Sequence, residues 1–213
     1  MSAVGKFLQS PLGFLEQNIL VVGWEGRPED NLGGRTDEMT FMTKPRTTAL
    51  ARKMGIDLGL YFVVPAAMAN ALPTMTPDGR TFDAYFCSYQ QNQTYGITLG
   101  KDADFMFTAT MDGCSLGIGN ANPDGSQLVY HSNLGGRSEE QRLVLGLVLG
   151  LSLGHVFEPS SYRFEYGQGV RKSTTMGIRS RTSNSWSFYA QIYFEDATVT
   201  PRKYFLREVK DID

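Results

Sequence analysis

Residues 104–133 read D-F-M-F-T-A-T-M-D-G-C-S-L-G-I-G-N-A-N-P-D-G-S-Q-L-V-Y-H-S-N, and three short apolar runs within this stretch decide the fold. The first run, Phe105 to Met111, is strand-like and ends at Asp112-Gly113. The second run extends from Cys114 to Ile118. After a turn-rich segment the third run, Gln127 to Tyr130, ends at His131. Short apolar runs bounded by turn residues predict strands, so we expect Cys114 and His131 at the ends of adjacent strands.

The dipeptide Asp112-Gly113 is a typical signal for a two-residue hairpin turn of type I′. Such a turn would place Cys114 beside Met111, at the exposed end of a hairpin. If the strand that carries His131 pairs with the strand after Cys114, the thiol and the imidazole can meet at the rim of the sheet. This geometry is the first expectation that a structure can test.

Strand signals also dominate on either side of this stretch. We predict a short helix over residues 3–17 that is interrupted at Pro11, and a second helix from Pro45 that ends at Gly55. Residues 27–35 form a predicted loop, and Pro77-Asp78-Gly79 a predicted turn. The predicted strands cover residues 18–24, 38–43, 58–67, 82–91, 95–99, 162–166, 174–181, 185–195 and 202–209. In the strand over 82–91 we expect Phe82, Ala84 and Phe86 on one face, and Asp83, Tyr85 and Cys87 on the other.

One helix is predicted with clear start and stop signals. Ser138 and Gln141 have the spacing of a capping box before an apolar run, which indicates a helix over about 139–153 with Gly154 just past its end. Gly146, Gly150 and Gly154 recur every four residues and so share one helix face. We expect this face to lie close to a sheet. The apolar run Leu143–Leu153 is shorter than the roughly 20 residues that a membrane-spanning helix needs.

About ten predicted strands, few helices and no regular alternation between them indicate an α+β fold, a sandwich of two mixed β-sheets flanked by a few helices. A length of 213 residues fits a single domain over residues 1–213. The net charge of −2 argues against a broad surface for nucleic acid or for anionic membrane. The N-terminus lacks the apolar segment of a secretory signal, so we expect synthesis in a reducing cytosol.

The chain contains two Cys and two His, and their placement favours nucleophilic chemistry at one pair. An adjacent imidazole can activate a thiol by taking its proton, provided that the two groups are within hydrogen-bond reach. Cys114 and His131 meet this requirement if their strands pair. Cys87 lies within a predicted strand, where a packing role is expected, and His155 follows the predicted helix end, where a capping role is expected. The spacing of these four residues matches no metal-binding motif, so we expect neither a metal ion nor another cofactor.

The segment D-F-M-F-T-A-T-M-D-G-C and the later His131 resemble the family of Cys-His glutamine deamidase toxins. The likeness is greater to the Burkholderia lethal factor branch than to the catalytic domain of cytotoxic necrotizing factor. It consists of an apolar strand with Thr108 six residues before the cysteine, the pair Gly113-Cys114, and a Gly-rich segment that leads to Val129-Tyr130-His131. It is tight over about thirty residues.

The resemblance implies roles for the site residues: Cys114 is the nucleophile, His131 the acid and base, and Thr108 the group that orients the histidine. Backbone N–H groups of Gly113 and Ser115 would stabilise the oxyanion. A strict two-residue hairpin puts Thr108 and Cys114 on opposite faces. In that case Thr108 acts through its backbone carbonyl, or the turn is bulged.

The resemblance further implies a bacterial effector that reaches the host cytosol and converts a glutamine of a host protein to glutamate. The implied target is the DEAD-box translation initiation helicase eukaryotic initiation factor 4A, with loss of translation as the outcome, and the protein is expected to act as a monomer. Three alternatives remain open. The same thioester could serve deamidation or transglutamination of Rho-family GTPases or hydrolysis of a peptide bond, and the chain could be a binding module without catalysis.

Overall fold

A computed structural model describes residues 1–22, 36–43, 59–70, 72, 74–135, 137–163, 165–166, 169–196, 198 and 202–213. The helices are α1 (Ala3–Gln9), α2 (Pro11–Gln17), α4 (Ala66–Ala69), α5 (Ser138–Leu149) and α6 (Pro159–Tyr162), with a 3-10 turn at Gly150–Ser152. The first strands are β1 (Asn18–Val22), β2 (Thr36–Thr43), β3 (Gly59–Pro65), β4 (Thr76–Cys87), β5 (Gln93–Leu99), β6 (Phe105–Thr108) and β7 (Ser115–Gly119). The remaining strands are β8 (Gln127–Asn133), β9 (Leu153–Phe157), β10 (Glu165–Tyr166), β11 (Gly169–Ser180), β12 (Ser185–Asp196) and β13 (Lys203–Asp211).

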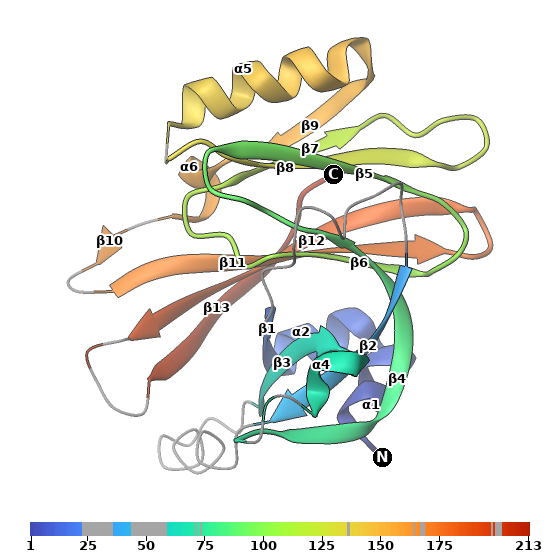
Figure 1. The fold of residues 1–213 in the computed structure, drawn as a ribbon, viewed down its shortest axis with the longest axis vertical. Helices are drawn as coiled ribbons and strands as arrows, with labels where there is room; N and C mark the ends of the chain where they lie inside the picture. The colour runs from blue at the N-terminus through green and yellow to red at the C-terminus, as the bar shows by residue number, and fades with distance from the viewer. Residues whose placement is uncertain are drawn as a thin grey trace.

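These strands form two sheets in separate layers (Figure 1). The large sheet has the order β1-β3-β2-β4-β6-β11-β12-β13, with β10 paired to β11 off this path. It is mixed, because β1 with β3 and β4 with β6 are parallel pairs. The small sheet, β5-β8-β7-β9, is antiparallel throughout. The α+β sandwich is therefore confirmed, with one sheet antiparallel where mixed pairing was expected.

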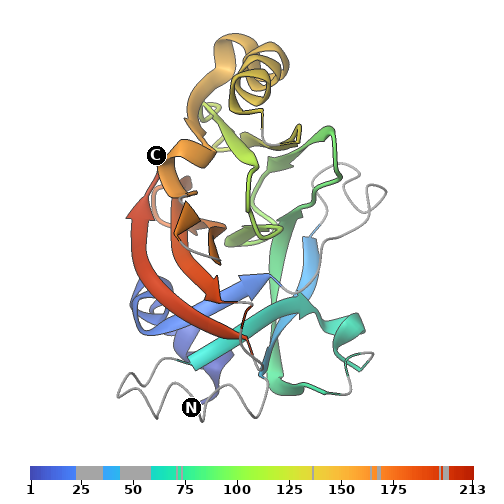
Figure 2. The same cartoon turned by 90° about the vertical axis from the view of Figure 1, so that its left-hand side faces the viewer.

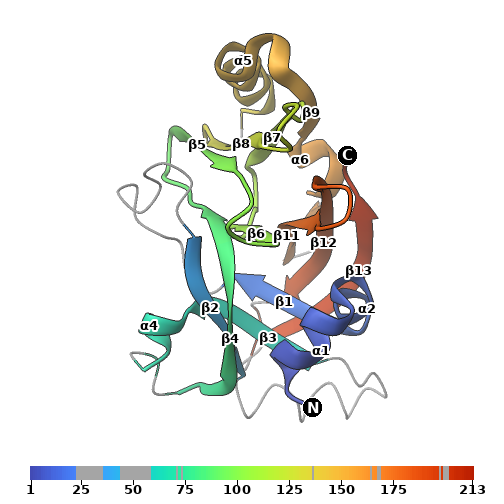
Figure 3. The ribbon, with the colours of Figure 1, turned by 90° about the vertical axis from the view of Figure 1, so that its right-hand side faces the viewer.

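The large sheet curls, as the two side views in Figures 2 and 3 show, and its first strand β1 reaches the last strand β13. Helices α1 and α2 pack against one face of it. The break at Pro11 is as predicted, and α1 is capped by a distant group, since the Asp78 carboxylate accepts from the Ala3 and Val4 N–H groups at 2.8 and 3.0 Å. Asp78 lies within β4, so the turn predicted at residues 77–79 is wrong. Gly79 adopts φ +76, and β4 continues through it.

β4 separates the two halves of the core, as its alternation predicted. Phe82, Ala84 and Phe86 join the cluster beneath the large sheet with α1 and α2. Tyr85 and Cys87 join the cluster between the sheets. Figure 3 shows this long strand running from the level of α1 toward β5. The lower cluster is rich in aromatic rings that pack at centroid distances of 4.9–6.2 Å around Phe7.

The segment after β6 is a corner between sheets and not the predicted hairpin. β6 belongs to the large sheet and pairs with β4 and β11, whereas β7 belongs to the small sheet. Between them Met111 forms an isolated bridge to Ser173, and Asp112-Gly113 carries the chain across. The chain does change direction at Asp112-Gly113, as predicted. The predicted hairpin is wrong, because residues 109–110 leave the large sheet before the turn.

Helix α5 covers the outer face of the small sheet (Figure 1). Leu145 and Leu149 rest on β7 at Gly117, where an added Cβ would stand 2.8 Å from Leu145. The close approach predicted for the three glycines is wrong for Gly146 and Gly150, where no described atom lies within 4 Å of an added Cβ. It is found at Gly154, which lies in β9 and not in the helix, and whose Cβ would stand 3.3 Å from the Ile118 carbonyl oxygen. The helix ends earlier than predicted, at Leu149, with Gly150 at φ 53 as its cap.

The remaining predictions differ in part. Tyr162 belongs to α6 and not to the strand predicted over 162–166. His155 lies exposed in the edge strand β9 and caps no helix. The loop predicted over 27–35 and the helix predicted from Pro45 to Gly55 lie outside the described residues.

Candidate active site

His131 lies on β8 of the small sheet, and Cys114 lies one residue before β7, the neighbouring strand. β7 and β8 pair antiparallel, with Leu116 opposite His131. Cys114 lies two residues before Leu116, just outside the paired part of β7, and both residues belong to the core cluster between the sheets. The strand pairing that the sequence predicted is therefore present, while none of the hydrogen bonds within the described residues joins the thiol to the imidazole.

Both residues are buried, contrary to the exposed rim that the sequence indicated. Cys114 is 2% exposed and His131 is fully buried. His131 is also the fifth residue of β8 and not its end. The reason is the sheet-to-sheet corner, which turns Cys114 into the core between the layers, beside Met111 and Leu116. A nearby surface hollow of about 340 Å³ is lined by Arg142, Glu158 and residues 153–156, and it contains neither catalytic candidate.

Burial keeps the thiol protonated. It raises the pKa of Cys114 to about 12, and the Asp112 carboxylate adds to this rise. Two groups act in the opposite direction: the backbone of Asp112 and the Arg163 guanidinium. One Arg163 nitrogen lies 3.2 Å from the point where a Cβ on Gly113 would stand, so the guanidinium comes close to the backbone beside Cys114.

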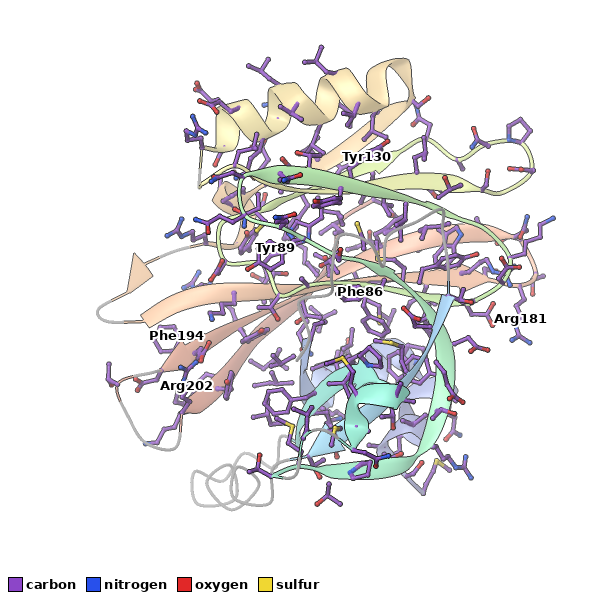
Figure 4. The ribbon with its side chains drawn as sticks, viewed as in Figure 1. Phe86, Tyr89, Tyr130, Arg181, Phe194 and Arg202 are labelled. Carbon is purple, nitrogen blue, oxygen red and sulfur yellow. The ribbon has the colours of Figure 1, made fainter. Side chains whose placement is uncertain are left out.

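Burial likewise keeps the imidazole neutral, lowering the pKa of His131 to about 4. The ring stacks on Tyr89 at 5.6 Å between centroids. Figure 4 shows Tyr89 between the two sheets, while Phe86 points into the layer below. Within the described residues neither ring nitrogen makes a hydrogen bond of normal geometry, although the backbone of Cys87 lies near enough to raise the pKa of the ring.

The sequence predicted only a packing role for Cys87, but in the structure its backbone also acts on His131. It closes β4 opposite Thr108 of β6, and its thiol donates to the Tyr95 carbonyl at 3.7 Å. Burial raises the pKa of this thiol to about 12, opposed in part by the backbone of His131. Its side chain packs in the core as expected, and its backbone acts on His131 by raising the pKa of the ring, while its carbonyl accepts from the Ala109 N–H at 3.4 Å. A backbone acceptor leaves no trace in residue identity, so no sequence signal could have indicated it.

Thr108 is buried in β6, and its hydroxyl bonds to other groups. It donates to the Ala109 carbonyl at 3.0 Å and shares a hydrogen bond of 2.5 Å with the Thr175 hydroxyl. None of its hydrogen bonds within the described residues reaches His131. The orienting role of Thr108 therefore stays a prediction.

The two residues predicted to donate to the oxyanion, Gly113 and Ser115, differ in their hydrogen bonds. The Gly113 N–H donates to the Tyr162 hydroxyl at 3.0 Å, so in this conformation it is occupied. Ser115 begins β7, and its hydroxyl is buried without a partner. Both assignments stay predictions.

In the described parts of the chain, no cluster of three or more His, Cys, Asp or Glu side chains could hold a metal ion, and no helix is long and apolar enough to cross a bilayer.

Comparisons with known proteins add little to this geometry. No protein-family model matches the chain, and no curated protein sequence matches it. Among solved structures, the chain is similar to the crystal structure of the C-terminal domain of CNFy from Yersinia pseudotuberculosis. The TM-score is 0.34 at 10% identity, and the match covers 65% of this chain and 66% of that chain, just under two thirds of its length.

Proposed function

We propose that the protein is a glutamine deamidase that acts on another protein, with Cys114 as its nucleophile and His131 as its acid and base. The observation that supports this proposal is the register of β7 and β8, which sets Leu116 opposite His131, with Cys114 two residues before Leu116 and just before the start of β7. The motif around Gly113-Cys114 and its resemblance to the deamidase toxins supply the reaction class.

The starting state is a neutral pair, since burial disfavours both the thiolate and the imidazolium. As the sulfur attacks the amide carbon of a glutamine, its proton passes to His131. His131 then protonates the nitrogen, ammonia leaves, and a thioester to Cys114 remains. A water molecule attacks the thioester and gives its proton to His131, which returns it to the departing thiolate. The net reaction converts glutamine and water to glutamate and ammonia.

Access to the sulfur requires a movement, because both catalytic candidates are buried. A glutamine side chain is narrow and presents its amide at the end of two methylenes, so it suits a deep site better than a polypeptide backbone does. This favours deamidation over peptide hydrolysis. Tyr89, which is half-buried and covers one face of the imidazole, is the side chain whose displacement we expect.

The target is proposed from the resemblance: the DEAD-box helicase eukaryotic initiation factor 4A, whose modification would stop translation after delivery to a host cytosol. The test is the mass of purified helicase, and then of proteins in a eukaryotic lysate, after incubation with the protein. We expect an increase of about one dalton at a single glutamine and equimolar ammonia. Two fragments would indicate proteolysis, a covalently added amine transglutamination, and an unchanged mass in every protein a binding module.

The deciding variant is Cys114→Ser, for which we expect a loss of about a thousand-fold or more in rate. Cys87→Ser is the matched control: it is the other buried cysteine, and the substitution keeps its backbone carbonyl. We expect it to retain measurable deamidation. Ammonia release by Cys114→Ser at the wild-type rate would refute the assignment.

A further inference from the structure

Two buried side chains from outside the strands hold the backbone of the nucleophile. The Tyr162 hydroxyl, at the end of α6, accepts from the Gly113 N–H at 3.0 Å and donates to the Cys114 carbonyl at 2.7 Å. Gln141, in the first turn of α5, donates from its amide to the Gly113 carbonyl at 2.8 Å. Within the described residues, the N–H of Cys114 is the one backbone polar group of Gly113-Cys114 that makes no hydrogen bond.

These contacts are more than the packing of α5 and α6 requires. The Tyr162 ring stacks on Phe157 at 5.2 Å, a contact that phenylalanine would make equally well. Gln141 is fully buried, and its side-chain oxygen has no hydrogen-bond partner. A buried polar atom without a partner costs stability, so an apolar residue would suit this helix position better if packing alone mattered. Both polar groups are instead directed at the backbone beside Cys114.

The same geometry corrects one prediction from the sequence. Ser138 and Gln141 have the spacing of a capping box, but α5 begins without a side-chain cap. The Gln141 amide turns away from the helix start toward Gly113. A pattern that normally indicates local capping here marks a long-range contact, from residue 141 to residue 113.

We infer that Tyr162 and Gln141 are positioning residues that fix the backbone of Gly113-Cys114 and leave the Cys114 N–H as the oxyanion donor. This inference rests on the proposed function and deepens it. The Gly113 N–H donates to the hydroxyl of Tyr162 and so is not free to donate to the oxyanion. With three of the four backbone groups engaged, the Cys114 N–H and its thiol keep a fixed direction relative to the corner at Asp112. An N–H fixed before the reaction stabilises a developing charge without reorganisation.

Tyr162 and Gln141, which together clamp the corner, also bear on the reactivity of the thiol. Burial raises the pKa of Cys114 to about 12, and the backbone of Asp112 opposes part of this rise. If the clamp is released, the corner loosens and water reaches the thiol, so the largest cause of the raised pKa is weakened. The reactivity of Cys114 should then shift to lower pH while ammonia release slows, a combination that a general loss of packing far from the corner would not produce.

The test is the rate at which iodoacetamide alkylates Cys114 as a function of pH, followed by peptide mapping to separate it from Cys87. The variants are Tyr162→Phe and Gln141→Met. Each has a matched control. Tyr85 is another buried tyrosine whose hydroxyl accepts from two backbone N–H groups, those of Gly100 and Asp102 at 3.0 and 3.3 Å. Gln191 is another buried glutamine, and its amide donates to the Leu15 and Asn18 carbonyls at 2.7 Å each.

We expect Tyr162→Phe and Gln141→Met to move the pH midpoint of alkylation downward and to slow ammonia release from the helicase about ten-fold or more. Tyr85→Phe and Gln191→Met should leave the pH midpoint of alkylation unchanged and the rate of ammonia release within two-fold of wild type, at melting temperatures comparable to those of the test variants. If each variant behaves like its control, the inference is wrong. If Tyr162→Phe does not fold, the Gln141 and Gln191 pair decides alone. Alkylation needs no substrate, so the result stands apart from the proposed function, which fails only if Cys114→Ser keeps wild-type ammonia release.

Discussion

The two faces of the large sheet are built on opposite principles. Beneath it, α1 and α2 close an apolar cluster centred on Phe7, with Phe41, Phe82 and Phe105 around it. Above it, between the sheets, the core contains polar atoms that have no hydrogen-bond partner among the described residues, including both nitrogens of His131 and the hydroxyl of Ser173. Buried polar atoms without partners are rare in native proteins and cost stability. The apolar layer beneath the large sheet therefore supplies stability, whereas the polar layer between the sheets retains unfavourable polar groups where chemistry is proposed.

The largest expected effect comes from the apolar layer. Phe7→Ala removes a fully buried ring that contacts five other aromatic rings, and we expect a loss of about 3–5 kcal/mol in the free energy of unfolding. Urea denaturation followed by circular dichroism measures it. The control is Leu147→Ala on α5, because Leu147 is 82% exposed and should change stability by under about 0.5 kcal/mol. A loss below 1 kcal/mol for Phe7→Ala would show that this cluster does not carry the stability assigned to it.

The polar layer should make stability depend on pH through His131. Its pKa is lowered from 6.5 to about 4 in the folded state, so the unfolded chain takes up a proton first as the pH falls. The stability that the neutral ring contributes is therefore complete above pH 6.5 and is lost as the pH falls toward 4. Linkage converts this shift to a change on the order of 3 kcal/mol over that window.

Urea denaturation at pH 7.5 and at pH 4.5 measures this loss. His131→Gln should remove most of the extra acid sensitivity, whatever its stability at pH 7.5. His155→Gln is the control, since His155 is the other histidine and lies exposed on β9. Equal acid sensitivity in wild type and in His131→Gln would contradict the burial of a neutral imidazole.

This contrast also explains how far the sequence could predict the molecule. The apolar layer follows from alternation: Phe82, Ala84 and Phe86 were assigned to one face of β4 and lie there. The pairing of β7 with β8 followed from the two apolar runs around Cys114 and His131. Alternation is a local property that each strand carries in its own residues, so it can be read without knowledge of neighbouring strands.

The site could be predicted only in part, because its remaining features depend on contacts between distant segments. The strand β6 joins one sheet and β7 the other, which no property of Asp112-Gly113 reveals. The backbone of Cys87, which raises the pKa of His131, belongs to a strand that ends 44 residues earlier in the chain. The amide of Gln141 looked like a local cap and contacts Gly113 instead. Backbone groups and long-range polar contacts carry no periodic pattern, so residue identities alone do not indicate them.

The smallest effect concerns Thr108, where the resemblance and the geometry give different expectations. The resemblance makes Thr108 the residue that orients His131. In the structure, the hydroxyl of Thr108 bonds to Ala109 and Thr175. The backbone of Cys87 is instead the group that acts on the His131 ring, by raising its pKa. If the backbone of Cys87 orients His131, Thr108→Val should cost only about 1 kcal/mol of stability, as for an ordinary buried hydrogen bond. Its rate of ammonia release should stay within about three-fold of wild type. Urea denaturation and the ammonia assay on the same preparations give both values.

Thr108→Ser separates the two roles, because it restores the hydroxyl and removes only a methyl group. A rate that falls more than ten-fold in Thr108→Val and recovers in Thr108→Ser would show that the hydroxyl itself orients the histidine. Equal rates in both variants would leave the orientation of His131 to the backbone at the end of β4. In that case the polar layer uses its side chains for proton transfer and its main chain for alignment, while the apolar layer beneath keeps both in place.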